Sequence, residues 1–381
     1  MAELSHRERV ALALDHQEAD RVPIDLMGNA SCILDGAYFK LRDHLGLDDS
    51  VKPFREGSTA NYYDPRLLEI FDVDFHRVFL KTTPAAAMKK NADGTETDVW
   101  GVTWNKSGIY VNADTHPLKD LDINGVANFD WPKAEMIWHS EGLAEEAKFL
   151  YENTDYAIVA RNPLTPGFLD RGCVMRGMDQ FMMDMALNKD LAKLIIDKTL
   201  EIHFKMWKMF LDAVGPYVAM VETADDLGGQ ENPLISPRMY RKFIKPAQQK
   251  VNALIKERAP QAKIFMHNDG AIVKLIPDLI DAGVEVLNPV QPSAGGMDSA
   301  FLKENFGEQL VFHGAVDQKP VEGSEEELRA EVRRRIDALA PGGGYILATS
   351  NVIVDPPTSN IPIIFEEARR YGRYPLKRIL I

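Results

Sequence analysis

Phe265-Met266-His267-Asn268-Asp269-Gly270 is the stretch of sequence that decides the fold. It follows an apolar run at 262–266 and precedes a helix-like segment at 272–281. A buried strand that ends in His-x-Asp-Gly and turns into a helix places two polar side chains at the strand's C-terminal end, where parallel α/β folds carry their chemistry. His267 and Asp269 are therefore candidate metal ligands or acid–base groups. The alternative is that they only cap the following helix.

Eight short apolar runs alternate with helix signals along the chain. The runs lie at 22–26, 75–80, 156–160, 217–221, 263–266, 284–287, 310–312 and 345–348. Parallel strands joined by right-handed crossovers produce this alternation, and eight strands close a (β/α)8 TIM barrel. We predict such a barrel over residues 1–381 as one domain, because no linker divides the chain. A six-stranded doubly wound sheet is the alternative, since the first two runs have weak boundaries.

Residues 87–112 interrupt this alternation. Asp93-Gly94 and the Asn-Lys-Ser-Gly stretch that follows it are turn signals flanked by alternating residues, which predicts a β-hairpin or meander inserted in an early connection. The insertion carries the aromatic residues Trp100, Trp104 and Tyr110. These rings either pack the hairpin onto the barrel or form a lid that walls the pocket.

The composition excludes several classes of function. Lys and Arg total 44 and Asp and Glu total 57, so the net charge is −13, which argues against nucleic-acid and anionic-membrane binding. No apolar stretch approaches the roughly 20 residues that span a bilayer, and residues 1–20 are too charged for a signal peptide. Cys32 and Cys173 lie far apart, in no zinc-binding spacing. We therefore expect a cytoplasmic protein without disulfides.

Polar residues follow most of the apolar runs. They are Asp25, Arg161, Asn162, Glu222, Asp225, Asp226, His267, Asp269, Asn288, Gln291, His313, Asp317, Ser350 and Asn351. The C-terminal ends of barrel strands converge on one face, so these side chains are expected to share a rim. Within the rim, Glu222, His267 and Asp269 come from adjacent strands and suit a divalent metal such as zinc with an open position. The alternative is a metal-free network in which a carboxylate orients His267.

The chain resembles the uroporphyrinogen decarboxylase superfamily. The resemblance covers most of the chain and is densest at 215–350. Its motifs are Val22-Pro23, the 224–230 stretch Ala-Asp-Asp-Leu-Gly-Gly-Gln, Leu234-Ile235-Ser236-Pro237, the His-x-Asp-Gly of 267–270, the 276–284 stretch, the 287–291 stretch Leu-Asn-Pro-Val-Gln, Leu302-Lys303, Phe306-Gly307, Phe312-His313-Gly314, Asp317 and the 340–345 stretch Ala-Pro-Gly-Gly-Gly-Tyr. The resemblance implies a (β/α)8 barrel with its site at the strand C-termini.

Two chemistries occur in that superfamily. True decarboxylases act on a porphyrinogen without a cofactor and carry an arginine-rich N-terminal motif for its carboxylates. The corresponding stretch here, 25–30, reads Asp-Leu-Met-Gly-Asn-Ala and contains no arginine. A pocket for several propionates would then lack its cations, which disfavours porphyrinogen decarboxylation.

The second chemistry is cobalamin-dependent methyl transfer. The coenzyme M methyltransferases of this branch bind zinc through His-x-Cys and a distant cysteine, whereas this chain has Asp269 and Ser350-Asn351 at those places. A shell of histidine and carboxylates, without thiolates, suits the activation of an ether oxygen rather than of a thiol. The resembling enzymes of that type demethylate methoxylated aromatics and pass the methyl group to the cobalt of a corrinoid protein.

These features predict a metal-dependent, corrinoid-dependent methyltransferase of the O-demethylase type. Glu222, His267 and Asp269 would hold zinc or another divalent metal. The substrate-binding candidates, chosen by their position after a predicted strand, are Met27, Asn29, Asp226, Gln291, His313 and Asn351. A cobalamin-binding Asp-x-His-x-x-Gly motif is absent, which favours a separate corrinoid protein as the source of cobalamin. The alternatives are a metal-free decarboxylase or other lyase and a noncatalytic small-molecule-binding barrel, and the sequence leaves a homodimer open.

Overall fold

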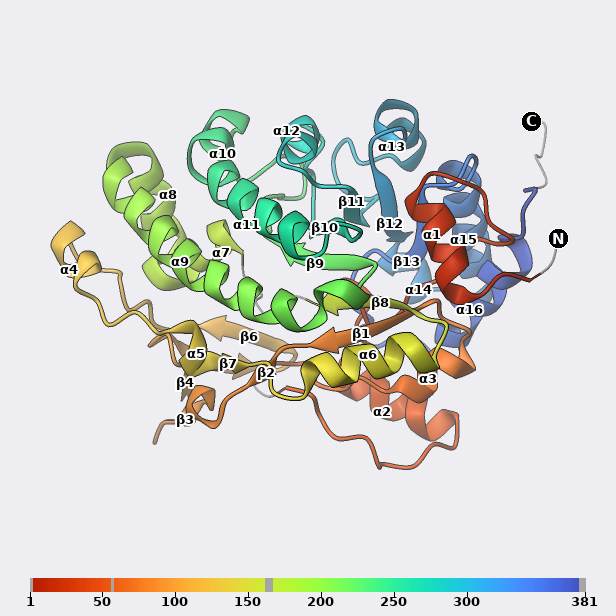
Figure 1. Cartoon of the computed structure of the whole chain (residues 1–381), viewed down its shortest axis with the longest axis horizontal. Helices are drawn as coiled ribbons and strands as arrows, with labels where there is room; N and C mark the ends of the chain where they lie inside the picture. The colour runs from red at the N-terminus through yellow and green to blue at the C-terminus, as the bar shows by residue number, and fades with distance from the viewer. Residues whose placement is uncertain (1–2, 56–57, 162–166, 377–381) are drawn as a thin grey trace.

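A curved, all-parallel sheet forms the centre of the molecule (Figure 1). The computed structural model describes residues 3–55, 58–161 and 167–376, apart from the side chain of Tyr110. The seven strands of the sheet, in spatial order, are β1 (Phe75–Phe79), β8 (Ala157–Arg161), β9 (Met220–Ala224), β10 (Lys263–His267), β11 (Val286–Val290), β12 (Val311–Val316) and β13 (Tyr345–Thr349). Each run of the sequence that was predicted as a strand from 75–80 onward therefore lies in this sheet.

The segment that contains Ile24 completes the barrel by occupying the eighth strand position, which we call the eighth stave. On one side, the amide of Leu347 donates to the carbonyl of Pro23 and the amide of Asp25 donates to the carbonyl of Leu347, both at 2.9 Å. On the other side, the amide of Asp74 donates to the carbonyl of Ile24 at 3.0 Å. This short bridge joins β13 to the start of β1, so the predicted TIM-barrel architecture is confirmed.

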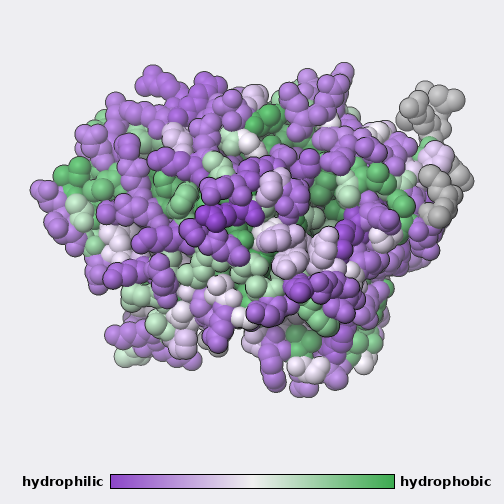
Figure 2. Space-filling model, in the orientation of Figure 1, coloured by the Kyte–Doolittle hydropathy of each residue, from purple (hydrophilic) through white to green (hydrophobic). Residues whose placement is uncertain are grey.

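Helices cover the outside of the sheet and fill the connections (Figure 1). In chain order they are α1 (His6–Leu14), α2 (Asp35–His44), α3 (Pro65–Ile70), η1 (Pro84–Ala86), α4 (Ile123–Ala127), α5 (Ala134–Ile137), α6 (Leu143–Asn153), α7 (Phe168–Arg176), α8 (Met178–Leu187), α9 (Lys189–Val214), η2 (Gly215–Tyr217), α10 (Pro237–Phe243), α11 (Lys245–Arg258), α12 (Ile276–Asp281), α13 (Ser299–Phe306), α14 (Gln318–Val321), α15 (Glu325–Leu339) and α16 (Asn360–Tyr371). Among these described helices, none is long and apolar enough to span a bilayer. Figure 2 shows mostly hydrophilic residues on the face it displays.

The interior of the barrel has an apolar layer and a polar layer. Val10 and Leu14 of α1 close the floor, where they contact an apolar cluster to which all seven strands of the parallel sheet contribute. Two residues farther along six of the seven strands, on the same inward face, the side chains become polar, whereas β13 has Ala348 at that place. These inward polar residues are Arg77, Arg161, Glu222, His267, Asn288 and His313, all buried. The polar residues of the barrel interior therefore form a layer directly above the apolar floor, toward the C-terminal ends of the strands.

The insertion in the first connection is a meander, the larger of the two forms predicted for it, rather than a single hairpin. Four antiparallel strands, β3 (Lys89–Lys90), β4 (Glu96–Thr97), β5 (Thr103–Ser107) and β6 (Tyr110–Ala113), form a separate sheet in that order. A further pair, β2 (Lys81–Thr82) and β7 (Trp138–His139), links the insertion to the barrel. Trp100 is 4% exposed and its ring lies 4.2 Å from the guanidinium carbon of Arg171 in α7. This tryptophan packs the insertion onto the body of the protein.

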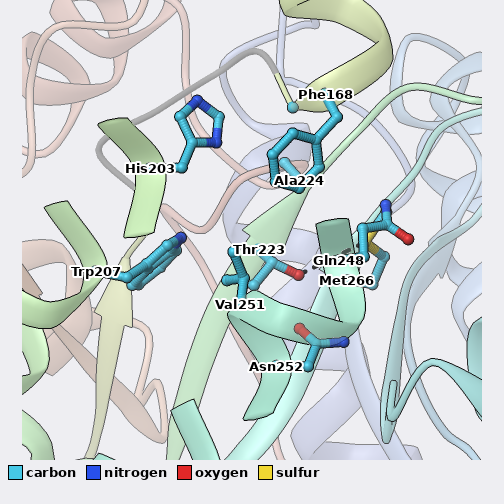
Figure 3. Close-up of a pocket in the computed structure, with 10 residues that line it drawn as sticks. Phe168, His203, Trp207, Thr223, Ala224, Gln248, Val251, Asn252 and Met266 are labelled. Atoms are coloured by element: carbon cyan, nitrogen blue, oxygen red, sulfur yellow. Dashed lines mark hydrogen bonds between the residues drawn. The ribbon is translucent and has the colours of Figure 1, made fainter. Parts of the chain in front are cut away.

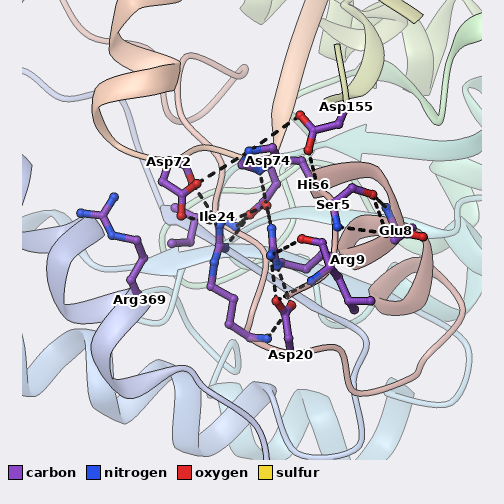
Figure 4. Close-up of polar contacts among 12 residues, drawn as sticks. Ser5, His6, Glu8, Arg9, Asp20, Ile24, Asp72, Asp74, Asp155 and Arg369 are labelled. Carbon is purple, nitrogen blue, oxygen red and sulfur yellow. Dashed lines mark hydrogen bonds and ion pairs between the residues drawn. The ribbon is translucent and has the colours of Figure 1, made fainter. Parts of the chain in front are cut away.

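Asp74 fastens α1 to the barrel (Figure 4). Its buried carboxylate accepts hydrogen bonds from Arg9 at 2.6 Å and from Arg21 at 2.7 Å, and it lies 2.9 Å from the ring of His6. The same carboxylate accepts from the amide of Ile24 at 2.7 Å. One buried anion thus connects the first helix, the eighth stave and the start of β1.

A candidate metal site at the C-terminal end of the barrel

Asp226, His267 and Asp269 converge at the C-terminal ends of β9 and β10. Each residue offers one possible ligand atom, and these atoms all lie within 4.8 Å of one another. The Nε2 atom of His267 is 3.5 Å from a carboxylate oxygen of Asp269 and 3.8 Å from one of Asp226. Ligands at about 2.0–2.1 Å from a tetrahedral zinc ion lie about 3.3 Å apart, so small side-chain movements would bring these three atoms into coordinating positions.

Close packing of two loops creates this arrangement. A Cβ atom on Gly228 would lie 2.1 Å from the carbonyl oxygen of Asp269, and one on Gly270, which has φ +84°, would lie 2.6 Å from the carbonyl oxygen of Gly229. Only glycine allows the two backbones to approach so closely. The buried amide of Asn268 adds a bond, because its Oδ1 accepts from the amide of Leu227 at 2.9 Å. The glycines and Asn268 therefore hold Asp226 beside Asp269.

The alternative prediction, in which His267 and Asp269 only cap the following helix, is wrong. The next helix, α12, begins at Ile276 rather than at 272, and its N-cap, Leu275, makes no side-chain capping bond. His267 and Asp269 instead face Asp226. The residues between the strand and the helix form a loop whose contacts are with the 225–229 loop.

The ring of His267 has one nitrogen fixed and one directed at the carboxylates. Its Nδ1 lies 2.8 Å from Oδ1 of Asn288, and its Nε2 faces Asp226 and Asp269. Burial lowers the pKa of His267, but the charges of Asp269 and Asp226 outweigh it and raise the pKa to about 10. The site therefore favours a positive charge at this position, and a divalent cation satisfies the same demand.

More carboxylates surround this cluster. Asp225 is fully buried and accepts from the amides of Leu169 and Asp170 at the start of α7, at 3.0 and 3.2 Å. Burial and the charge of Asp170 raise the pKa of Asp225 well above its usual range. Burial and the charge of Asp226 raise the pKa of Asp170 to about 7. A bound cation would relieve this repulsion, and oxygen-rich surroundings with one imidazole fit zinc and harder divalent ions alike.

Glu222 does not join the cluster, although the sequence predicted it as a ligand. In the sheet it pairs with Phe265, whereas His267 pairs with Ala224, so Glu222 lies one pleat deeper. Its Oε1 accepts two hydrogen bonds from Arg77 at 3.0 Å, and its Oε2 lies 3.9 Å from Arg161. The carboxylate that reaches His267 is instead Asp226, which the sequence placed among the substrate-binding residues.

His313 is also placed differently from the prediction of a substrate contact. It is 1% exposed, with Nδ1 at 2.8 Å from Asn288 and Nε2 at 2.7 Å from Asp25. Both ring nitrogens are thus committed to protein partners. No role was predicted for Asn288, and Arg77 was not among the predicted site residues. Both nevertheless lie two residues beyond an apolar inward residue, Val286 and Phe75 respectively. That spacing was the available signal.

The remaining substrate candidates lie around the rim. Met27 has φ +66° and its carbonyl accepts from Arg161 at 2.8 Å, while Oε1 of Gln291 accepts from the amide of Gly270 at 3.0 Å. Asn29 is partly buried, and Asn351 accepts from the amide of its neighbour Val352. The loops that carry these two asparagines are joined by an isolated bridge at Ile33. Their contact with a substrate stays a prediction, and Asn162 lies outside the described residues.

Two cavities lie away from the cluster. One of about 420 Å³ separates the insertion from α2, and its wall includes Trp104, Phe39 and Arg55. The other, of about 30 Å³, lies between the barrel wall and helices α9 and α11 (Figure 3). It has room for roughly one water molecule, and burial lowers the pKa of His203 in its wall to about 3. Trp104 thus lines a cleft beside the insertion.

Comparison with known proteins gives a family and a fold. The profile of the family described as uroporphyrinogen decarboxylase (URO-D) matches residues 169–371. Two curated proteins named uroporphyrinogen decarboxylase, from Microcystis aeruginosa and Synechocystis sp., are 26% and 24% identical over 156 and 151 residues. The match covers 40% of this chain and 41% of each relative, so the chain spans under half the length of these curated relatives.

One solved structure is similar over almost the whole chain. It is described as a methyltransferase from Methanosarcina mazei, and it has a TM-score of 0.66 at 18% sequence identity. The alignment covers 97% of this chain and 99% of that one. At this identity the similarity establishes the shared barrel fold.

Proposed function

Because the chain belongs to the uroporphyrinogen decarboxylase family, we propose that it is a metal-dependent methyltransferase of that family. The methyl donor would be a methoxylated aromatic compound, and the acceptor would be the cobalt of a separate corrinoid protein. The observation that carries the proposal is the convergence of Asp226, His267 and Asp269 within 4.8 Å. The full-length similarity to a barrel described as a methyltransferase is consistent with it.

The residues of this chain have defined tasks in the proposed reaction. Asp226, His267 and Asp269 would hold the metal, and Asn288 would keep the ring of His267 turned toward it. A bound divalent metal would supply a Lewis acid at the ether oxygen of the donor. The bond that breaks joins the methyl carbon to that oxygen, and its electron pair stays on oxygen as the phenolate leaves. The corrinoid would supply the nucleophile that accepts the methyl group.

The half-exposed position of the cluster suits a reaction between two proteins. The side chains of Asp226 and Asp269 are 48% and 35% exposed, whereas that of His267 is 10% exposed. The carboxylates are therefore open to a donor and to an acceptor that approaches the barrel rim. The buried imidazole keeps a fixed place beneath them.

Decarboxylation is the second candidate, because the curated relatives are named uroporphyrinogen decarboxylases. Arg77 and Arg161 are cations in the barrel interior that could meet a substrate carboxylate. However, Arg77 is already paired with Asp25 and Glu222, at 2.8 and 3.0 Å. A decarboxylase of this kind would need no metal and would keep its activity after chelation.

The test measures bound metal and methyl transfer on the same samples. After dialysis against metal-free buffer and addition of zinc, we expect about one ion per chain, measured by plasma mass spectrometry. The zinc-loaded protein is then mixed with 2-methoxyphenol and cob(I)alamin, free or carried by a corrinoid protein, and the loss of the cob(I)alamin absorption band is followed. Asp269→Asn should lose both zinc and transfer. Asp317→Asn is the matched control, since this rim carboxylate caps α14.

Three outcomes separate the candidates. Transfer that follows zinc content supports the methyltransferase. Zinc binding without transfer to any corrinoid acceptor counts against the proposed reaction. Absence of zinc binding, together with chelator-resistant loss of CO₂ from a porphyrinogen, would replace it with the decarboxylase.

A further inference from the structure

A continuous line of hydrogen bonds runs around the barrel interior from the metal cluster on β10 to Glu222 on the adjacent strand β9. We call it the interior chain, and its members in order are His267, Asn288, His313, Asp25, Arg77 and Glu222. The successive distances are 2.8, 2.8, 2.7, 2.8 and 3.0 Å. No side chain in it is more than 10% exposed. Besides β10, which carries His267, five other strand positions of the barrel each contribute one residue. The barrel therefore fixes the spacing of the whole line.

The direction of each bond in the interior chain is determined by the charge of Arg77. A guanidinium group only donates, so Asp25 accepts from it. Although burial raises the pKa of Asp25, the charge of Arg77 and the hydrogen bond from His313 hold that pKa well below its usual range. A carboxylate only accepts, which requires that Nε2 of His313 carries the proton that it shares with Asp25.

The same logic continues to the metal cluster. Nδ1 of His313 lies 2.8 Å from Nδ2 of Asn288, and because an amide NH2 group only donates, Nδ1 is the acceptor. The amide is then oriented with Oδ1 toward His267, where it accepts from Nδ1. When the ring is neutral, as metal binding requires, its proton stays on Nδ1 and the lone pair of Nε2 faces Asp226 and Asp269.

We propose that Asn288 and His313 are positioning residues for the metal site, because they hold His267 in the tautomer that can bind a metal through Nε2. This inference rests on the proposed function, since it assumes that His267 is a ligand. If the amide of Asn288 were reversed, its Nδ2 would face Nδ1 of His267 and the proton would move to Nε2. That proton would block coordination, so His313 influences the metal without contacting it.

The experiment measures zinc affinity in the full-length protein by competition with a chromogenic chelator. Loss of a group that orients a metal-binding histidine typically weakens metal affinity 10–100-fold. We expect a loss of that size for Asn288→Leu and for His313→Leu. Asn288→Asp should stay within a few-fold of the unmodified protein, because a carboxylate still accepts from Nδ1 of His267.

His203→Leu is the matched control for a buried histidine. His203 is 4% exposed and lies in the wall of the small cavity between the barrel and α9, away from the interior chain (Figure 3). We expect its zinc affinity to equal that of the unmodified protein. A loss equal to that of His313→Leu would show a general effect of removing buried polarity and would overturn the proposal.

A second measurement is independent of whether the leucine variants fold. In ¹⁵N-histidine spectra of the zinc-loaded, unmodified protein, His267 should carry its proton on Nδ1 and His313 on Nε2. The reverse assignment of either ring would overturn the proposal. Unchanged affinity in both leucine variants would also overturn it while leaving the proposed function in place. Failure of the unmodified protein to bind zinc would instead remove the proposed function and this inference together.

Discussion

Glu222 and Asp226 exchange the roles that the sequence predicted for them, and the cause is strand register. Glu222 lies within β9, whereas Asp226 lies two residues beyond the end of that strand. The pairing of His267 with Ala224 places Glu222 below the imidazole and Asp226 above the end of the strand. A buried Arg77 then neutralises Glu222, whereas Asp226 keeps an exposed carboxylate beside Asp269.

This difference gives a direct test at one residue. Glu222→Gln should keep about one zinc ion per chain, because Glu222 lies outside the cluster. It should lower the free energy of unfolding by about 3–5 kcal/mol, since it leaves a buried arginine charge partly unpaired. Zinc content and urea unfolding of the same preparation measure both effects. Loss of zinc from a well-folded Glu222→Gln protein would show that Glu222 is a ligand after all.

The residues of the candidate site were only partly predictable. The sequence identified His267 and Asp269, because a polar pair directly after a buried strand is visible without a structure. Alternation also places residues two apart on one face, which would have pointed to Arg77 and Asn288. It does not reveal that His313 uses both ring nitrogens on Asn288 and Asp25, because those contacts depend on how far each strand is shifted against the next.

Local signals predicted helix starts better than they predicted the insertion. Ser5 and Ser324 form the capping boxes expected from Ser-x-x-Glu, and Ser236 caps α10 just before Pro237. These motifs act within one helical turn, so they are readable from neighbouring residues. The strands β3 and β4 have two residues each. Strands this short leave no periodic pattern, so the sequence predicted a hairpin or a meander without deciding between them.

We call Asp74, together with the arginines that it binds, the Asp74 clamp. Among the contacts of α1, this clamp is the one whose loss should destabilise the protein most. Asp74→Asn removes the charge that binds Arg9 and Arg21, both buried. We expect a loss of about 3–5 kcal/mol in the free energy of unfolding, because two arginine charges would remain partly unpaired. Chemical denaturation measures the loss. Asp155→Asn is a suitable control, because its half-exposed carboxylate lies 4.0 Å from His6 at the edge of the same contact, and its variant should change stability little.

The same clamp predicts how stability depends on pH. Burial raises the pKa of Asp20, but hydrogen bonds from Arg9 and from backbone amides outweigh it and lower the pKa to about 2. Hydrogen bonds and charges from His6, Arg21 and Arg9 likewise lower the pKa of Asp74 against the effect of burial. Unfolded aspartate has a pKa of about 3.9. A depressed folded pKa gives stability that is present above about pH 4 and is lost as the pH falls toward 2.

The urea concentration at the unfolding midpoint should therefore decrease as the pH is lowered from 4 to 2. The decrease should be smaller in Asp20→Asn. This variant no longer has the aspartate that takes up a proton on unfolding in that range. Parallel curves for the two proteins would mean that Asp20 has the same pKa in the folded and unfolded states.

At the scale of the whole molecule, the number and order of the apolar runs favoured the barrel over the doubly wound sheet, and the structure confirms the barrel. Seven runs became strands in sequence order around the sheet, and the eighth closed it at Ile24. Sequential strands joined by helices have few other ways to bury both faces of a parallel sheet. The order of the strands is not enough to predict the site, because His267 and Glu222 come from adjacent strands and yet lie at different levels of the barrel.

The barrel itself should report metal binding. The proposed ligands belong to the loops after β9 and β10, and Asn288 extends their support to β11. A metal bound to the folded state alone stabilises it by about 2.7 kcal/mol when its free concentration is 100 times the dissociation constant. For a chain of 381 residues, that free energy corresponds to a rise in Tm of about 3 °C. Differential scanning calorimetry with and without zinc measures the shift, and Asp269→Asn should show none. An equal shift in Asp269→Asn would place the bound zinc elsewhere on the protein, because the affinity of this site depends on both carboxylates that face Nε2 of His267.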